Sequence, residues 1–376
     1  MYLTNDEEHA LNGEYGNTLA TAYRVLVAIG ESTDAERLIP IEWAHVSGVN
    51  YNTIGDAGLS FLEEIDQKVK VKTSLNPMGF DPNRPYMVRE EFKERQMRIV
   101  NAYRNMGVEM TLSCIPYEIF PIPKDNAYAS IAESNAAVYV NSFLNILTNK
   151  ESAISALASA LSGKAPYSLL RIEELRKPDT RIILNTELMN ELDYGLLGYF
   201  AGKHAKNSVS IPSLPKEIWN KKALSAGLGT SGSCCMVTDE DSGEIIEYSK
   251  RDAEELKGEL SNGNDSNIIV FGSPQLGSHD IKRLASSIRG KKFKKRCMIF
   301  CARKAYEYVR SDIERLEKAG AEIYSDCCAC LTPLIDSQDS VVTNSIKAAY
   351  YLKTWNKAKV VLKSMEEIVS SECHDS

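Results

Sequence analysis

Short apolar runs and amphipathic segments alternate over much of the chain. Runs such as residues 268–271 and 297–301 are typical of buried strands, whereas the charged segment 90–106 has helical spacing. The pattern predicts strands over residues 38–46, 69–75, 108–112, 268–271, 297–301 and 321–324. It predicts helices over residues 59–65, 90–106, 281–288 and 304–319, and a last major helix from about residue 344.

Strands that alternate with helices of this length indicate parallel sheets covered by helices on both faces. The sequence therefore predicts an α/β fold. We expect an α/β region over residues 1–130, a helical and mixed region over residues 131–264, and a second α/β region over residues 265–376. The middle region stands apart because residues 134–162 are rich in Ala and Ser, and residues 206–245 contain several Pro, Gly and Ser turns.

Composition and charge argue against two classes of partner. The 376 residues carry a net charge of −7, so no dominant basic surface is expected to bind nucleic acid. The dense basic patch at residues 291–296 is expected to be a solvated turn. No apolar stretch approaches the roughly 18 residues that a membrane helix needs, and the first residues lack the basic and apolar segments of a leader. We therefore predict a cytoplasmic protein without nucleic-acid or membrane partners.

Nine cysteines are the strongest indication of chemistry. Cytosolic thiols stay reduced, and an odd number without regular spacing makes a poor disulfide framework, so metal binding and burial remain. Cys114 lies between a predicted strand and a proline, Cys301 ends another strand, and three more crowd residues 327–330. Such positions suit iron–sulfur ligands, which can lie far apart in sequence. Burial explains any single one of these cysteines at least as well.

The pair Cys327 and Cys330 has C-x-x-C spacing, which can bind zinc or carry redox chemistry. A zinc site would need a second pair at matching spacing, which the sequence lacks. A redox pair usually opens a helix, whereas Leu-Thr-Pro at residues 331–333 favours a loop. Cys234 and Cys235 are neighbours in an expected strand, so they point to opposite faces and do not both reach one metal.

Other candidate segments follow predicted strands, at the edge where open α/β sheets bind ligands. They are residues 47–49, 76–77 and 113–114 and the loop after Tyr324. Glu133 and Ser134 precede an Ala-rich helix, and they either cap it or bind an anion there.

Three further segments are weaker candidates for ligand binding, because two of them also have a purely structural interpretation and the third lacks part of a phosphate-binding motif. Residues 272–278 either bind a ligand or form a turn with a helix cap. Lys347 either pairs with an anion near the start of the last major helix or is an ordinary surface lysine. Residues 227–233 are rich in Gly and Ser, but they lack the Lys-Ser/Thr that completes a phosphate-binding loop.

Taken together, these segments resemble the aconitase X family over nearly the whole chain. Each segment alone is a weak match, but their order and spacing form a strong signal. The matching stretches are Leu11–Gly16, His45–Val49, Asn76–Pro77, Cys114–Tyr117, Glu133–Ala136, Asp193–Tyr194, Asp326–Cys328 and Thr343–Lys347.

The resemblance implies an aconitase-like α/β fold of several regions, with parallel sheets and without the swivel domain. It also implies a 4Fe–4S cluster on Cys114 in the first region and on Cys301 and Cys328 in the last, with one iron open to substrate. Family members tend to have Asp-Thr-Cys at residues 326–328, which selects Cys328 over its neighbours. The residues implied to contact a small anionic substrate are Gly48, Val49, Asn50, Asn76, Pro77, Glu133, Ser134 and Lys347.

The chain also departs from the family pattern. Many relatives have Gly-Cys-Pro-His where this chain has Gly-Ser-Pro-Gln at residues 272–275, so we exclude Ser273 as a cluster ligand. Residues 145–150 replace a common Gly-Ala-Arg-Thr-Asn-Arg segment, and Asn50 stands where Ser is common.

The activity that the resemblance implies is an iron–sulfur hydro-lyase. It would dehydrate (R)-5-phosphomevalonate to trans-anhydromevalonate 5-phosphate in the archaeal mevalonate route to isoprenoids. The swivel domain would belong to a separate small subunit, which would supply the catalytic base and complete a heterodimer. No base is therefore assigned to this chain. A hydroxyproline dehydratase of the same family, a non-catalytic homologue and a zinc-binding module are the alternatives.

Overall fold

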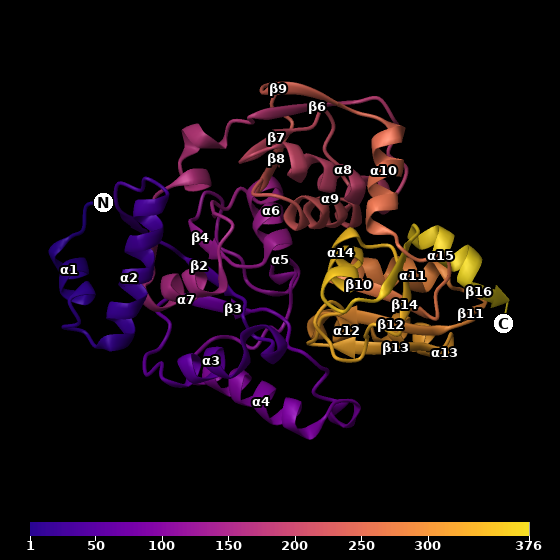
Figure 1. Cartoon of the computed structure of the whole chain (residues 1–376), viewed down its shortest axis with the longest axis horizontal. Coiled ribbons are helices and arrows are strands. Elements are labelled where there is room, and N and C mark those ends of the chain that lie inside the picture. Colours follow the sequence, from indigo (N-terminus) through magenta and orange to yellow (C-terminus); the bar gives the residue numbers. More distant parts are fainter. Residues whose placement is uncertain (376) are drawn as a thin grey trace.

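Three parallel sheets follow one another along residues 1–375, which the computed structural model describes. Figure 1 shows the N-terminal part in indigo and magenta, the middle part at the top and the C-terminal part in orange and yellow at the right. Two small antiparallel strand pairs, β1–β5 and β11–β16, accompany them. Within these residues, no helix is long and apolar enough to cross a membrane.

The N-terminal part is built around a sheet of order β3-β2-β4, in which the central strand β2 (Trp43–Val46) is buried at every position. The other strands of this part are β1 (Leu38–Pro40), β3 (Lys72–Leu75), β4 (Ala129–Ile131) and β5 (Lys164–Pro166). Its helices are α1 (Asn5–Leu11), α2 (Asn17–Ser32), α3 (Tyr51–Glu63), α4 (Glu90–Asn105), α5 (Pro116–Ile119), α6 (Ser134–Phe143) and α7 (Ala153–Ser162), with 3₁₀ turns at Pro85–Met87, Leu169–Arg171 and Glu173–Arg176.

The middle part contains a sheet of order β8-β7-β6-β9 and a pair of closely packed helices, α8 and α9. Its elements are β6 (Thr180–Leu184), α8 (Glu191–His204), β7 (Ser208–Ser210), α9 (Ile218–Thr230), β8 (Met236–Thr238), β9 (Glu244–Tyr248) and α10 (Lys250–Leu260).

The C-terminal part contains a sheet of order β13-β12-β10-β14-β15. Its strands are β10 (Ile268–Leu276), β11 (Lys291–Phe293), β12 (Arg296–Cys301), β13 (Ala321–Ser325), β14 (Ser340–Thr343), β15 (Lys359–Leu362) and β16 (Cys373–Asp375). Its helices are α11 (Ser278–Ser287), α12 (Arg303–Tyr308), α13 (Arg310–Lys318), α14 (Ile346–Thr354) and α15 (Met365–Glu372).

The predicted α/β class with parallel sheets is confirmed, but the predicted strand over residues 108–112 is wrong. This segment runs beside β3, since Glu109 N donates to Thr73 O at 2.9 Å. The next backbone hydrogen bond between the two segments does not form, because Leu75 N donates to the Thr111 side chain, at 2.7 Å, instead of to a backbone oxygen. Leu112 then has a positive φ of 44°, which ends the extended conformation.

Other predicted elements needed correction at their boundaries. The predicted strand over residues 38–46 is divided, because β1 pairs with β5 whereas β2 belongs to the parallel sheet. The predicted helix over residues 304–319 breaks at Val309, whose ψ of 45° is not helical. Cys234 and Cys235 lie before β8 and not inside a strand, and the basic run at residues 291–296 includes β11.

Glycines allow three helices to pack with their backbones almost in contact. A Cβ atom at Gly198 of α8 would lie 2.2 Å from Leu224 O, and one at Gly227 of α9 would lie 2.1 Å from Gly195 O. A Cβ atom at Gly229 would lie 2.8 Å from the Ser134 carbonyl carbon at the start of α6. The Gly-rich segment 227–233 therefore begins inside α9, where it fixes the position of the first turn of α6.

We predict that Gly227→Ala destabilises the protein by about 1–3 kcal/mol, because the added methyl group forces α8 and α9 apart. Gly258→Ala is the matched control, since Gly258 lies in the exposed part of α10 and nothing outside its own helix lies within 4 Å of the place that the added methyl group would take. The control should gain up to about 1 kcal/mol of helix stability. Chemical denaturation measures both, and equal stabilities of the two variants would contradict the close packing.

Candidate functional site

A cavity of about 260 Å³ lies where strand ends of the N-terminal and C-terminal sheets meet. Ser47 follows β2, Asn76 and Pro77 follow β3, and Glu133 follows β4 by one residue. The C-terminal part contributes residues after β13 and β14. The predicted gathering is therefore confirmed for the segments after β2, β3 and β13, and Cys114 also lines the cavity although no strand immediately precedes it. The lining residues are Ser47, Thr53, Asn76, Pro77, Cys114, Ala132, Glu133, Ser134, Ser273, Cys328, Cys330, Leu331, Lys347, Tyr351 and Trp355.

A buried ion pair between Glu133 and Lys347 crosses one wall of the cavity. The Lys347 ammonium also donates to Asn135 Oδ1 at 2.7 Å and to Ser134 Oγ at 3.3 Å. Burial favours the neutral form of each group, but the opposite charge outweighs it, so the pKa of Glu133 is lowered and that of Lys347 is raised. Both groups therefore stay ionised at neutral pH, and Lys347 is not an ordinary surface lysine.

Hydrogen bonds extend from this ion pair into the N-terminal sheet. Asn76 Nδ2 donates to Glu133 Oε2 at 2.8 Å, so Asn76 Oδ1 is free to accept from His45 Nε2 at 2.9 Å. This assigns the proton of the neutral imidazole to Nε2. The other nitrogen, Nδ1, then accepts from Ser74 Oγ at 2.8 Å. Burial lowers the pKa of His45 to about 4, although the bond to Asn76 works in the opposite direction.

Three thiols line the cavity, those of Cys114, Cys328 and Cys330. Cys328 Sγ and Cys330 Sγ lie 3.8 Å and 2.9 Å from the Ser273 hydroxyl oxygen. Burial raises the pKa of Cys114. The pKa of Cys328 is lowered to about 7, first by a hydrogen bond from the Cys330 side chain and further by a backbone N–H and by Lys347, against the effect of burial.

Gln275 connects the backbone segments that carry these thiols. Its side-chain Nε2 donates to Cys327 O at 3.0 Å and to Leu112 O at 3.3 Å, and its Oε1 accepts from Cys114 N at 3.3 Å. Its backbone N–H also donates to Cys114 Sγ at 3.1 Å. Because Gln275 is fully buried, this single side chain sets the spacing between the Cys114 segment and the loop after β13.

Four of the predicted site residues do not line the cavity. Gly48 and Val49 lie in the turn after β2, where Val49 O accepts from Gln96 Nε2 at 2.6 Å. Asn50 caps α3 and donates to Leu331 O at 2.9 Å, so it supports the cysteine loop from behind. Cys301 is fully buried at the end of β12, where its thiol donates to Tyr324 O at 3.6 Å.

Several residues of the site give little signal in the sequence. His45 belongs to a matching stretch, but nothing local shows that it bonds to Asn76. Cys330 is conspicuous in the sequence only as half of a C-x-x-C pair. Ser273 is conspicuous only because many relatives have a cysteine at that position. Asn135 belongs to a matching stretch and Gln275 to a segment that departs from the family pattern, but their bonding roles depend on partners at residues 347 and 114 and leave no local sign.

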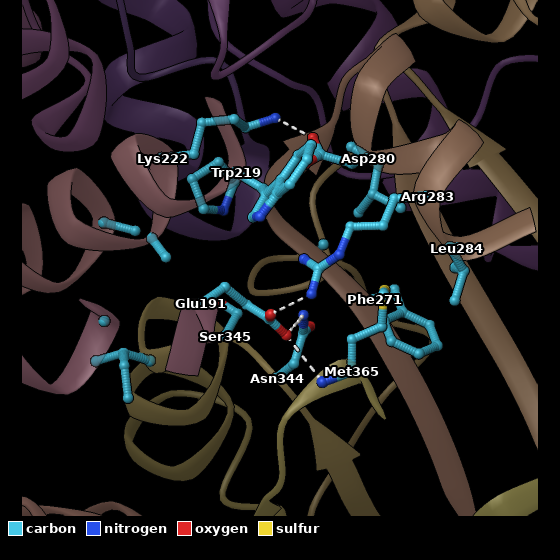
Figure 2. A pocket seen from close by; sticks show the side chains of 17 residues that line it. Glu191, Trp219, Lys222, Phe271, Asp280, Arg283, Leu284, Asn344, Ser345 and Met365 are labelled. Carbon is cyan, nitrogen blue, oxygen red and sulfur yellow. Dashed lines mark hydrogen bonds and ion pairs between the residues drawn. The ribbon is translucent and has the colours of Figure 1, made fainter. Parts of the chain in front are cut away.

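A second pocket lies behind the segment that carries Ser273, and Figure 2 shows its lining. Gly272 and Pro274 face this pocket, whereas Ser273 faces the thiol cavity. The charged groups of the second pocket pair with one another: Lys222 with Asp280, and Arg283 with Glu191. At about 80 Å³ it is smaller than the thiol cavity, and its paired charges are better explained as structural.

Comparison with known proteins identifies the family. Models of the aconitase X first, second and third domains match residues 1–174, 178–257 and 266–374. The chain belongs to the aconitase X family. The structure of aconitase X from Thermococcus kodakaraensis in its holo form superposes with a TM-score of 0.91 at 32% identity, and the match covers 99% of this chain and 100% of that chain. The predicted aconitase-like fold is thereby confirmed.

Sequence relatives within the aconitase X family are dehydratases by name. The chain is 35% identical to the phosphomevalonate dehydratase large subunit of Methanocaldococcus jannaschii, over 98% of this chain and 99% of that protein. It is 34% identical to the same subunit of Methanosarcina mazei, over 98% and 96%. It is 30% identical to cis-3-hydroxy-L-proline dehydratase of Hypocrea jecorina, over 99% of this chain but 68% of that protein.

The lowered pKa of His45 predicts a specific loss of stability in acid. The unfolded chain takes up a proton near pH 6.5, whereas the folded chain does so only near pH 4. The contribution of His45 to the free energy of unfolding is therefore fully present above pH 6.5. It is lost as the pH falls from 6.5 toward 4, and the loss reaches about 3 kcal/mol. Denaturation of His45→Gln, which cannot titrate, should show a shallower pH dependence in this window. Parallel curves for the wild type and the variant would contradict the assignment.

A double-mutant comparison tests the Glu133–Lys347 ion pair. Lys347→Met leaves a buried carboxylate unpaired and should cost about 3–5 kcal/mol of unfolding free energy. Adding Glu133→Gln removes that charge and should recover a large part of the loss. Lys250→Met is the matched control, because the Lys250 side chain is 81% exposed and its pair with Glu254 should contribute less than about 1 kcal/mol. Equal stability of the single and double variants would show that the charges are not coupled.

Proposed function

We propose that the chain is the large subunit of a phosphomevalonate dehydratase, an iron–sulfur hydro-lyase of the cytoplasm. The observation that carries the proposal is the match of this chain to relatives of that name over almost the full length of both partners, 98% and 99% for the Methanocaldococcus jannaschii protein. The reaction would remove a hydroxyl group from the carbon β to a carboxylate and a proton from the α carbon. The products would be water and trans-anhydromevalonate 5-phosphate.

The thiol cavity supports an iron–sulfur cluster as the cofactor. Within residues 1–375, no three His, Cys, Asp and Glu side chains are grouped tightly enough for a single metal ion. Thiols that surround a cavity of about 260 Å³ suit a larger cluster, since iron–sulfur centres take Cys thiolates as ligands. We assign Cys114 and Cys328 as ligands, and the cavity does not support Cys301 as the third. When bound, a cluster with an open iron supplies a Lewis acid for the departing hydroxyl group.

The chain's own residues are suited to bind an anionic substrate. Lys347 lines the cavity, and the first turn of α6 begins beside it with free backbone N–H groups. A helix N-terminus and an ammonium group both favour carboxylate or phosphate oxygens. Glu133 offsets part of the positive charge of Lys347. When an anionic substrate binds, the Lys347 ammonium group would pair with the substrate in place of part of its contact with Glu133. The proposed substrate contacts remain Gly48, Val49, Asn50, Asn76, Pro77, Glu133, Ser134 and Lys347, of which the first three lie behind the lining.

The catalytic base that removes the α proton is expected on a partner subunit and not on this chain. Glu133 is the carboxylate that lines the cavity, but its lowered pKa makes it a weak acceptor of an α proton. Both nitrogens of His45 are engaged in hydrogen bonds, and the ring does not line the cavity. The words "large subunit" in the names of the relatives imply a small subunit for those proteins. We propose that a swivel-domain small subunit completes a heterodimer here and supplies the base.

Hydroxyproline dehydratase is the second candidate, because two relatives carry that name. The chain covers only 68% and 65% of their lengths, so they contain a further segment that this chain does not match. The chain is more similar to the phosphomevalonate dehydratase large subunits, at 35% and 34% identity, than to these two relatives, at 30% and 26%, and this difference favours phosphomevalonate.

We predict that the large subunit, loaded with iron and sulfide without oxygen and mixed with its small subunit, dehydrates phosphomevalonate and not cis-3-hydroxyproline. The large subunit alone should show little or no turnover, because it lacks the base. Product formation is followed by mass spectrometry of the two reactions side by side. Turnover of hydroxyproline alone would establish the second candidate, and full activity without the small subunit would contradict the assignment of the base.

A further inference from the structure

The thiol cavity contains a cysteine that the resemblance did not assign. Cys330 lines the cavity together with Cys114 and Cys328, whereas Cys301 does not. Cys330 is 4% exposed, and its thiol hydrogen-bonds to the neighbouring ligand candidate Cys328. Outside this loop the thiol contacts the Ser273 hydroxyl at 2.9 Å and the Lys347 carbonyl at 3.9 Å. Both of these groups belong to the cavity wall.

The loop after β13 holds Cys328 and Cys330 toward the same point. Both thiols contact the Ser273 hydroxyl oxygen, at 3.8 Å and 2.9 Å, so the two side chains share one side of the loop. The loop is fixed at both ends, because Met78 N donates to Asp326 O at 2.9 Å and Asn50 Nδ2 donates to Leu331 O at 2.9 Å. Cys114 faces the loop and is held to it through Gln275.

Cys301 is placed differently. It is the last residue of β12, it pairs with Ser325 of β13 in the parallel sheet, and its thiol donates to a carbonyl of the neighbouring strand. Its side chain is fully buried and does not line the cavity. A metal bond from Cys301 would break the hydrogen bond from its thiol to Tyr324 O, whereas Cys330 already lines the cavity.

We infer that Cys330 supplies the third thiolate of the cluster, with Cys114 and Cys328, and that Ser273 occupies the space beside it. The inference rests on the proposed function, since it concerns the same cofactor. Each of the three thiols loses its proton when it binds iron. The Ser273 hydroxyl then donates to the Cys330 sulfur, and Lys347 lies in the same cavity to offset part of the negative charge.

The test uses the full chain, loaded anaerobically with ferrous iron and sulfide and then desalted. Iron, acid-labile sulfide and visible absorbance per chain are measured for the wild type and for Cys330→Ala, Cys301→Ala and Cys327→Ala. Cys330→Ala should lose iron and absorbance by roughly ten-fold or more, because loss of even an outer partner of a metal ligand costs about that much. Cys301→Ala and the control Cys327→Ala should keep the cluster. Circular dichroism of each protein before loading confirms that it is folded.

A second variant tests whether cluster binding can be restored by a thiol at a neighbouring position. Ser273→Cys added to Cys330→Ala places a thiol within 2.9 Å of the lost one and should restore iron, sulfide and absorbance. Failure to restore them in a folded protein overturns the placement of Ser273 beside the third ligand. Retention of the cluster by Cys330→Ala, or its loss from folded Cys301→Ala, overturns the assignment of Cys330.

The outcomes separate this inference from the proposed function. A wild-type chain that takes up no iron and sulfide refutes both the cofactor and the inference. A wild-type chain that loads normally but does not dehydrate phosphomevalonate refutes the proposed substrate, and the ligand assignment is then decided by the variants alone.

Discussion

The cavity depends on a contact between residues 214 positions apart, the buried ion pair of Glu133 and Lys347. Either charge alone would be costly to bury, so each side chain stabilises the buried charge of the other where α6 and α14 begin. Asn76 and His45 extend the contact to the N-terminal sheet. This polar network and the backbone hydrogen bond from Met78 N to Asp326 O together connect the strand ends of the two sheets, and the cavity forms between them.

The glycines of α9 act on the same region from the opposite side. Gly229 lets α9 approach the carbonyl of Ser134, and Gly198 of α8 and Gly227 of α9 let these two helices approach each other. The first turn of α6 is therefore held both by close packing against the α9 backbone at Gly229 and by the hydrogen bond from Lys347 to Ser134. Small residues and a charged pair, which have little in common chemically, fix the same element.

Elements with a strong local pattern could be predicted from the sequence. β12 and α11 follow from apolar runs and helical spacing, and the placement of Asn76 and of Cys328 in loops after strands follows from the same patterns. That these loops, which belong to two different sheets, meet at one cavity did not follow from the sequence pattern. Residues 108–112 could not be predicted, because their strand-like pattern is overruled by a hydrogen bond to the Thr111 side chain. The C-x-x-C spacing of Cys327 and Cys330 was also misleading, since only Cys330 lines the cavity. Sequence spacing does not show which side of a loop a thiol occupies.

Gln275 has a consequence for how the proposed cluster would be taken up. Its bonds to the Cys114 and Cys327 backbones lie within the protein, so they fix the spacing of these two segments before any cluster binds. The conformational entropy of arranging the segments is then lost during folding and not during cluster assembly. A cluster lost to oxygen would therefore be rebuilt without refolding of the protein, and the supply of iron and sulfide would set the rate of repair.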